Sequence, residues 1–126
     1  MNTPEELAYT AEHEWVQELN DGRLKIGITD FAQDALGDVV YIDLPDTPKE
    51  AEAGAVVAEV ESTKSVSEIY MPIAGTVDDT NEALGDSPDL VNADPYGAGW
   101  FFIMTPADEA DRSTLIDAAA YKELTE

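Results

Sequence analysis

The stretch AVVAEVESTKSVSEIYM, residues 55–71, decides the fold, because two strand-like runs flank a turn of small hydroxyl residues. In the first run Val56, Ala58 and Val60 fall on alternate positions, and a period of two is typical of a half-buried strand. The second run continues to the end of the stretch. Serine and threonine tolerate tight turns, so we predict a hairpin that presents Lys64 at its tip.

Lys64 is isolated from the other cations of the chain. Gly54 lies ten residues before it and Gly75 eleven after it, while the nearest basic residues are Lys49 and Arg112. Exposed lysines are usually solvated and without a role, which is one interpretation. The other is a lysine held out for a second protein to modify, and the pattern does not name the modification.

The composition bounds the class of protein. The chain has 126 residues, 44% of them hydrophobic, and a formal net charge of −22, so it can bury a core and should repel nucleic acid and anionic membranes. Such a charge suits partners with basic docking faces or a high-salt setting. With no cysteine and only His13 as histidine, we expect no disulfide, no metal site and no Ser-His-Asp triad.

Targeting segments are not evident. Residues 1–6 are acidic without an apolar core, and no apolar run approaches the length of a membrane span. We therefore expect a cytoplasmic protein that contacts no membrane.

The rest of the chain predicts a small antiparallel β-sandwich or barrel with flanking helices. Further strands are expected at residues 13–18, 23–28, 40–44, 73–77 and 100–104. Asp30 is expected to cap a short helix that ends at Gly37. The connection at residues 48–53 is expected to be polar and irregular. A C-terminal helical segment, about 107–126, should be one helix or two and should cover the sheet near Phe101.

No complete catalytic constellation is present, which favours a carrier over an enzyme. Gly97-Ala98-Gly99 lacks the third glycine and the following helix of a dinucleotide-binding fingerprint. Glu14, beside Trp15, has two interpretations: a strand carboxylate facing solvent, or a carboxylate that lines a groove for a cation.

The chain resembles the H proteins of the glycine cleavage system over nearly its whole length. The matching blocks are residues 12–15 (EHEW), 27–30 (GITD), 32–33 (AQ), 36–40 (LGDVV), 43–45 (DLP), 61–65 (ESTKS), 72–73 (PI) with Gly75, 86–92 (DSPDLVN), 94–97 (DPYG) and 99–100 (GW). The departures are Glu68, where many relatives have Asp, and Met71, where a small residue is common.

The resemblance implies a single lipoyl-carrier domain over residues 1–126, a mainly β sandwich of the lipoyl/biotinyl barrel-sandwich type. It implies that Lys64 bears lipoic acid as an amide, and that Glu14 and Glu68 lie near the arm in a surface cleft. The arm would take an aminomethyl group from the pyridoxal-phosphate enzyme glycine decarboxylase to a folate-dependent aminomethyltransferase. Dihydrolipoamide dehydrogenase would reoxidise the dithiol, and lipoyl-attaching enzymes would install the group.

The protein itself would be a non-catalytic carrier, expected as a monomer. Two alternatives remain: an H-like lipoate relay of another pathway, and a β interaction domain without a prosthetic group.

Overall fold

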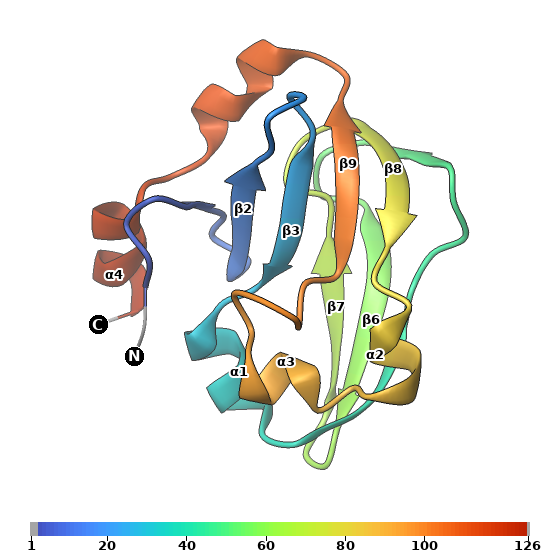
Figure 1. The fold of residues 1–126 in the computed structure, drawn as a ribbon. Helices are drawn as coiled ribbons and strands as arrows, with labels where there is room; N and C mark the ends of the chain where they lie inside the picture. The colour runs from blue at the N-terminus through green and yellow to red at the C-terminus, as the bar shows by residue number, and fades with distance from the viewer. Residues whose placement is uncertain (1–2, 126) are drawn as a thin grey trace.

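The computed structural model describes residues 3–125 as two antiparallel sheets with short helices around them (Figure 1). The larger sheet has the order β1 (Ala8–Tyr9), β2 (Glu14–Glu18), β3 (Leu24–Ile28), β9 (Phe102–Pro106), β8 (Gly75–Thr80) and β5 (Lys49–Ala51). The smaller sheet has the order β4 (Val39–Asp43), β6 (Val56–Ser62) and β7 (Val66–Tyr70). The helices are α1 (Asp30–Leu36), α2 (Ala83–Asp86), α3 (Leu90–Ala93), the 3-10 helix η1 (Glu109–Thr114) and α4 (Ala118–Thr125). The prediction of a mainly β, antiparallel sandwich is confirmed.

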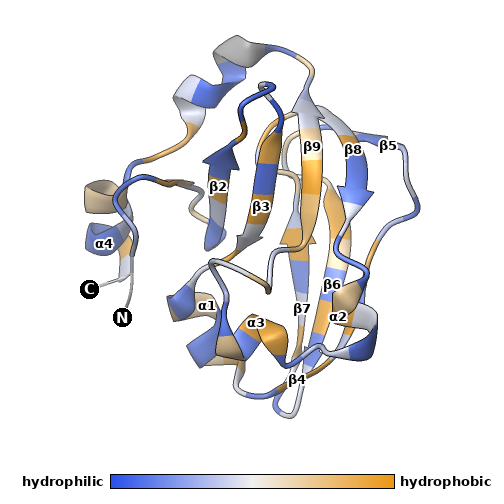
Figure 2. Ribbon diagram, viewed as in Figure 1, coloured by the Kyte–Doolittle hydropathy of each residue, from blue (hydrophilic) through white to orange (hydrophobic). Residues whose placement is uncertain are grey.

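One apolar core joins the two sheets. Ile26 and Phe102 of the larger sheet and Val60 of the smaller one are completely buried in the same cluster. Figure 2 shows the apolar residues concentrated along β3, β6 and β9. Burial of apolar surface is the dominant favourable contribution to folding, so this shared core fixes the smaller sheet, which carries Lys64, on the larger one.

Two β-bulges change which residues face the core. The alternation in the sequence put Val40 and Val56 on the buried faces of their strands, but they are 53% and 40% exposed, and Val39 and Val57 are buried instead. The pairing of β6 slips between Val39 and Tyr41 on one side and between Val56 and Ala58 on the other. A bulge adds one residue to a strand and so inverts the alternation beyond it. The predicted orientation of these valines was therefore wrong.

Helix α1 is capped one residue earlier than expected. The Thr29 hydroxyl, not the Asp30 side chain, accepts the backbone N–H of Ala32 at 3.2 Å. Asp30 instead accepts the side-chain amide of Gln33 at 2.7 Å. Gly37 ends the helix as predicted, with its N–H donated to the Gln33 carbonyl.

Residues 49–51 pair with β8 as β5, although the sequence suggested an irregular connection there. The sequence shows no strand pattern here, because two of the three residues, Lys49 and Glu50, are charged. It lies at the edge of the larger sheet, where charged side chains are common.

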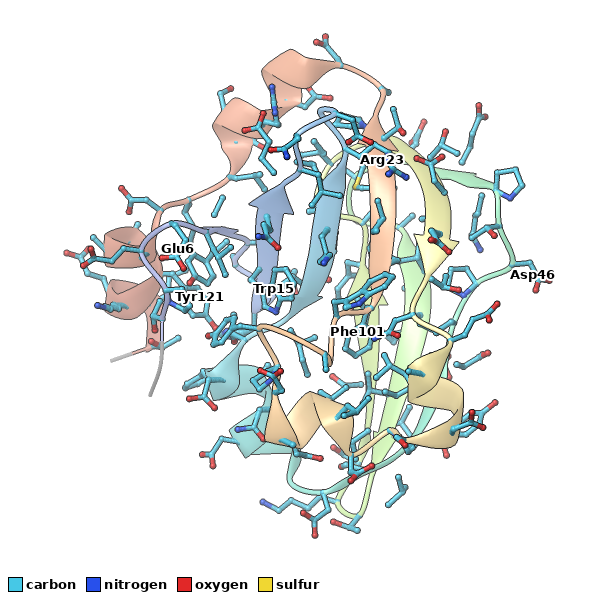
Figure 3. All side chains as sticks on the ribbon, in the orientation of Figure 1. Glu6, Trp15, Arg23, Asp46, Phe101 and Tyr121 are labelled. Carbon is cyan, nitrogen blue, oxygen red and sulfur yellow. The ribbon has the colours of Figure 1, made fainter. Side chains whose placement is uncertain are left out.

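The C-terminal segment forms two helices and does not pack near Phe101 as expected. Tyr121 of α4 stacks on Tyr9 with ring centroids 4.8 Å apart, in a second apolar cluster that includes Trp15. In Figure 3 Tyr121 lies against the N-terminal segment, away from Phe101. Phe101 is instead completely buried in the main core, a cluster that contains no described residue of α4, whereas Tyr9 belongs to the second cluster together with Ala118 and Tyr121. Within residues 3–125, no helix is long and apolar enough to cross a membrane.

Candidate functional site

The turn between β6 and β7 holds Lys64 in a fixed place on the surface. The Ser62 hydroxyl accepts the backbone N–H groups of Lys64 at 3.2 Å and Ser65 at 3.1 Å, and the Ser62 N–H is donated to the Ser65 carbonyl at 2.8 Å. A hydroxyl that bonds nearby backbone in this way stabilises a turn. The Lys64 side chain is exposed, and the turn is the lowest part of the molecule in Figure 1. The predicted hairpin is confirmed.

The turn is also bonded to the segment that follows α1. The N–H of Thr63 is donated to the Asp38 carbonyl at 3.0 Å. Gly37, beside Asp38, has φ 77° and ψ −155°, a region open essentially to glycine alone. The end of α1 and the hairpin tip are therefore one connected structure.

A groove of about 300 Å³ lies beside the tip, between β7 and α1. The apolar residues that line it are Ile28, Phe31, Ala32, Ala35, Leu36 and Ile69. The polar residues that line it are Glu12, His13, Ser65, Ser67 and Glu68. Sites for small organic groups are typically of this kind, apolar with a few polar groups. The groove can accept a chain of methylenes whose end carries a cation.

Glu14, which follows the groove residue His13 in the chain, is buried, with 1% of its surface exposed. Its two carboxyl oxygens accept the Thr10 hydroxyl at 3.1 Å and the backbone N–H of Tyr70 at 2.7 Å. Burial raises the pKa of this carboxyl to about 8, against the lowering effect of both hydrogen bonds. Glu14 is therefore largely protonated at neutral pH when nothing cationic is close.

His13 forms part of the groove and is held from the C-terminal helix. Its Nδ1 lies 2.8 Å from the Tyr121 hydroxyl, which lies 2.6 Å from the Thr29 hydroxyl. The His13 ring also packs on Phe31, with centroids 4.9 Å apart. Burial lowers the pKa of His13, so the neutral imidazole predominates at neutral pH.

The structure thus separates the residues singled out in the sequence. Glu68 lines the groove beside Lys64, whereas Glu14 is not among the lining residues and Glu12 is. An even spacing of two would put Glu12 and Glu14 on one face of a strand, but His13 between them has φ 66° and breaks the alternation. Glu12, His13 and Phe31 were not predicted to line the groove. For Glu12 and His13 the reason is that the sequence gives no indication of a left-handed backbone at His13.

Comparison with known proteins shows the family of the chain. The family model for the glycine cleavage H-protein matches residues 7–126. The glycine cleavage system H protein of Nocardia farcinica is 55% identical over 124 residues, covering 95% of this chain and 94% of the relative. That of Micrococcus luteus is 56% identical over 123 residues, covering 97% and 96%.

A solved structure shows the same fold. The crystal structure of a glycine cleavage system H protein from Mycobacterium marinum superposes with a TM-score of 0.87 at 36% identity, covering 97% of this chain and 98% of that one. Family model, relatives and fold agree over nearly the full length. The chain belongs to the glycine cleavage H-protein family, the carrier proteins of the glycine cleavage system.

Proposed function

We propose that Lys64 bears lipoate in amide linkage and that the protein is the lipoyl-lysine carrier of glycine cleavage. The observation that carries the proposal is an exposed lysine on a hydrogen-bonded turn, next to a groove lined by both apolar and polar residues. Lipoate, when bound, supplies the sulfur that accepts an aminomethyl group and is left as a dithiol.

The residues of the groove fit that group. Phe31, Leu36 and Ile69 offer apolar surface for its methylenes, and Glu12 and Glu68 offer carboxylates for an amine at its end. Amide formation would remove the Lys64 charge. The modified side chain could then lie against the apolar residues of the groove without bringing an ammonium group into contact with them. Because the arm is tethered, its effective concentration at each partner's site is raised without new contacts.

The carboxylates would keep an amine in the groove protonated. A nearby negative charge raises the pKa of an amine. Each unit of that rise corresponds to ~1.4 kcal/mol in favour of the protonated form. We place Glu14 and Glu68 in this role, as the family resemblance implies, and add Glu12. A cation in the groove would lower the pKa of Glu14 from its value of about 8, so Glu14 would ionise as the cation arrives.

The partners would be glycine decarboxylase, the folate-dependent aminomethyltransferase, dihydrolipoamide dehydrogenase and the lipoyl-attaching enzymes, all met in the cytoplasm. The net charge of −22 favours partner surfaces that are basic around their active sites. The chain's own role would be that of a non-catalytic carrier.

Lipoylation followed by intact mass and peptide mapping tests the proposal. Wild-type protein and Lys49→Arg should gain one lipoyl group on the peptide that contains Lys64, and Lys64→Arg should gain none. Lys49→Arg is the matched control, because Lys49 is also an exposed strand-end lysine. Modification that persists in Lys64→Arg would refute the assignment.

Reconstituted exchange of carbon dioxide with the glycine carboxyl group separates the two lipoylated functions. A glycine cleavage carrier supports the exchange once it is lipoylated. A lipoylated protein that supports none would instead be a relay of another pathway, and an unmodified protein a β interaction domain.

A further inference from the structure

We propose that Gly37 and Asn92 are positioning residues for the Lys64 side chain. Gly37 has no side chain, and Asn92 fastens the Gly37 backbone by hydrogen bonds, so together they form the surface along which the stem of the Lys64 side chain lies. They thereby set the direction in which an attached group leaves the hairpin. For the lipoylated protein this inference rests on the function proposed above. For the unmodified lysine it stands on the contacts alone.

The first observation is the contact between Lys64 and Gly37. A Cβ atom added at Gly37 would lie 3.3 Å from Lys64 Cε, 3.6 Å from Cδ and 3.8 Å from Cγ. Three successive methylenes of the stem therefore lie along Gly37 at the place where any other residue would have its Cβ atom. Leu36, the residue before Gly37, lines the groove, so the stem lies at the groove's end.

The second observation is that Asn92 fastens this surface. Its side-chain amide is donated to the Gly37 carbonyl at 2.8 Å and to Gln33 Oε1 at 3.0 Å, and its Oδ1 accepts the N–H of Val39 at 2.9 Å. One side chain of α3 thus bonds the backbone on both sides of Asp38.

The third observation links this fastened segment to the lysine's own backbone. Asp38 lies between Gly37 and Val39, whose backbone groups Asn92 bonds, and its carbonyl accepts the N–H of Thr63, the residue before Lys64. The root of the Lys64 side chain and the surface under its stem are consequently held by the same segment. A shift of that segment would change the direction of the side chain, not only its mobility.

A methyl group at residue 37 should redirect the lysine more than it disturbs the fold through this contact. The Lys64 side chain is exposed, so it can move away by rotating to another rotamer. The strain of the positive φ is a separate cost, and Gly54 provides the control for it. Gly54 has φ 83°, yet an added Cβ there would meet nothing within 4 Å.

The test uses four variants and two measurements. Gly37→Ala is compared with Gly54→Ala, and Asn92→Asp with Asn20→Asp. The latter pair makes the same chemical change, once in the fastening residue and once on the exposed turn between β2 and β3. Asn92→Asp keeps an oxygen for the Val39 N–H but loses both donors, so it decides the question if Gly37→Ala folds poorly.

The first measurement is NMR of the unmodified protein. Nuclear Overhauser contacts should join the Lys64 methylenes to the Gly37 α protons in wild type, Gly54→Ala and Asn20→Asp. In Asn92→Asp these contacts should weaken. In Gly37→Ala and Asn92→Asp the Lys64 Cε order parameter should fall to that of the exposed Lys122. Absence of the contacts in wild type, or an unchanged Lys64 in both test variants, would overturn the proposal.

The second measurement follows formaldehyde release from lipoylated protein that carries the aminomethyl group. Gly37→Ala and Asn92→Asp should release it about fivefold faster than their controls, the factor that corresponds to ~1 kcal/mol and to one unfavourable rotamer. Release equal to that of the controls would overturn the role in directing the arm. If Lys64 gains no lipoyl group, the proposed function fails, while the NMR result still decides the positioning of the lysine.

Discussion

The Glu14 carboxyl group accepts the backbone N–H of Tyr70 at 2.7 Å, and so joins β2 of the larger sheet to the end of β7 in the smaller one. This link between the sheets starts at the residue that follows His13, which lines the groove beside Lys64. The ionisable group that makes this link is buried, with 1% of the Glu14 surface exposed.

Glu14 should make the fold less stable as the pH rises. Its folded pKa is raised to about 8, while an unfolded glutamate titrates near 4.3. Between these values the folded state binds more protons than the unfolded state, so the free energy of unfolding falls as the pH increases. Glu14→Gln removes this proton and should lack the effect.

Urea denaturation of both proteins from pH 5 to pH 8 checks this. Subtracting the two profiles cancels the self-repulsion of the other carboxylates. The advantage of Glu14→Gln should grow with pH by about 2–4 kcal/mol. Profiles that stay parallel would show that Glu14 is ionised in the folded protein throughout.

Replacing the carboxylates that line the groove, Glu12 and Glu68, or the buried Glu14 carboxyl should hasten formaldehyde release from the loaded protein. A neutral amine expels the thiolate and a protonated amine does not, so a carboxylate that raises the amine pKa moves the rise in release to higher pH. Glu14→Gln, Glu68→Gln and Glu12→Gln should each move it back, with the largest shift for Glu14→Gln.

The gap from wild type should be widest between the two amine pKa values, and smallest well below both. Glu50→Gln, on edge strand β5, serves as the control for loss of one exposed charge. Identical rates across the pH range for all the groove variants would leave these carboxylates without a role in the loaded state.

Tyr121→Phe should loosen the groove wall from the C-terminal helix. The change keeps the stacking on Tyr9 but removes the hydroxyl that lies 2.8 Å from His13 Nδ1 and 2.6 Å from Thr29 Oγ1. Losing a buried hydroxyl with these partners should cost about 1–2 kcal/mol, measured by urea denaturation. Tyr41→Phe, at a position that is 54% exposed, should change stability by less than about 0.5 kcal/mol. Equal effects of the two changes would contradict the tie.

Lys64→Ala should leave stability unchanged within about 0.5 kcal/mol, because the side chain is exposed and the turn bonds only its backbone. Ser62→Ala should cost about 1 kcal/mol, since the Ser62 hydroxyl accepts two N–H groups of the turn. Thermal or urea unfolding compares the two variants. A large loss in Lys64→Ala would mean that the lysine supports the fold rather than only being presented by it.

Association with partner enzymes should slow as salt is added. Exposed charges are screened beyond about 8 Å at physiological ionic strength, and steering acts on the association rate more than on dissociation. Stopped-flow association with dihydrolipoamide dehydrogenase, measured across salt concentrations beside a stability series, separates steering from relief of self-repulsion. An association rate independent of salt would remove steering from the proposed function.

The sequence predicted those features whose causes are local. The hairpin around Lys64 follows from turn chemistry in four adjacent residues, and the end of α1 from Gly37. The family resemblance implied that Glu68 lies near an attached arm; the structure shows that Glu68 lines the groove.

Features that depend on distant contacts were not predictable. The bulges that expose Val40 and Val56 arise from pairing across β6. The burial of Glu14 depends on an N–H that comes from Tyr70, 56 residues away. The packing of α4 on Tyr9 rather than near Phe101 depends on which of the two buried clusters each ring joins. Periodicity within one strand holds none of this information.

The tie between Tyr121 and His13 spans 108 residues, whereas the turn that holds Lys64 is bonded within four. Local contacts form early in folding and distant ones late, and a chain is synthesised from its N-terminus. On the ribosome, the lysine tip can therefore be in place before Tyr121 is available to hold His13, which lines the groove. The nascent chain could thus present Lys64 for modification first, and complete the groove that would receive the loaded arm later.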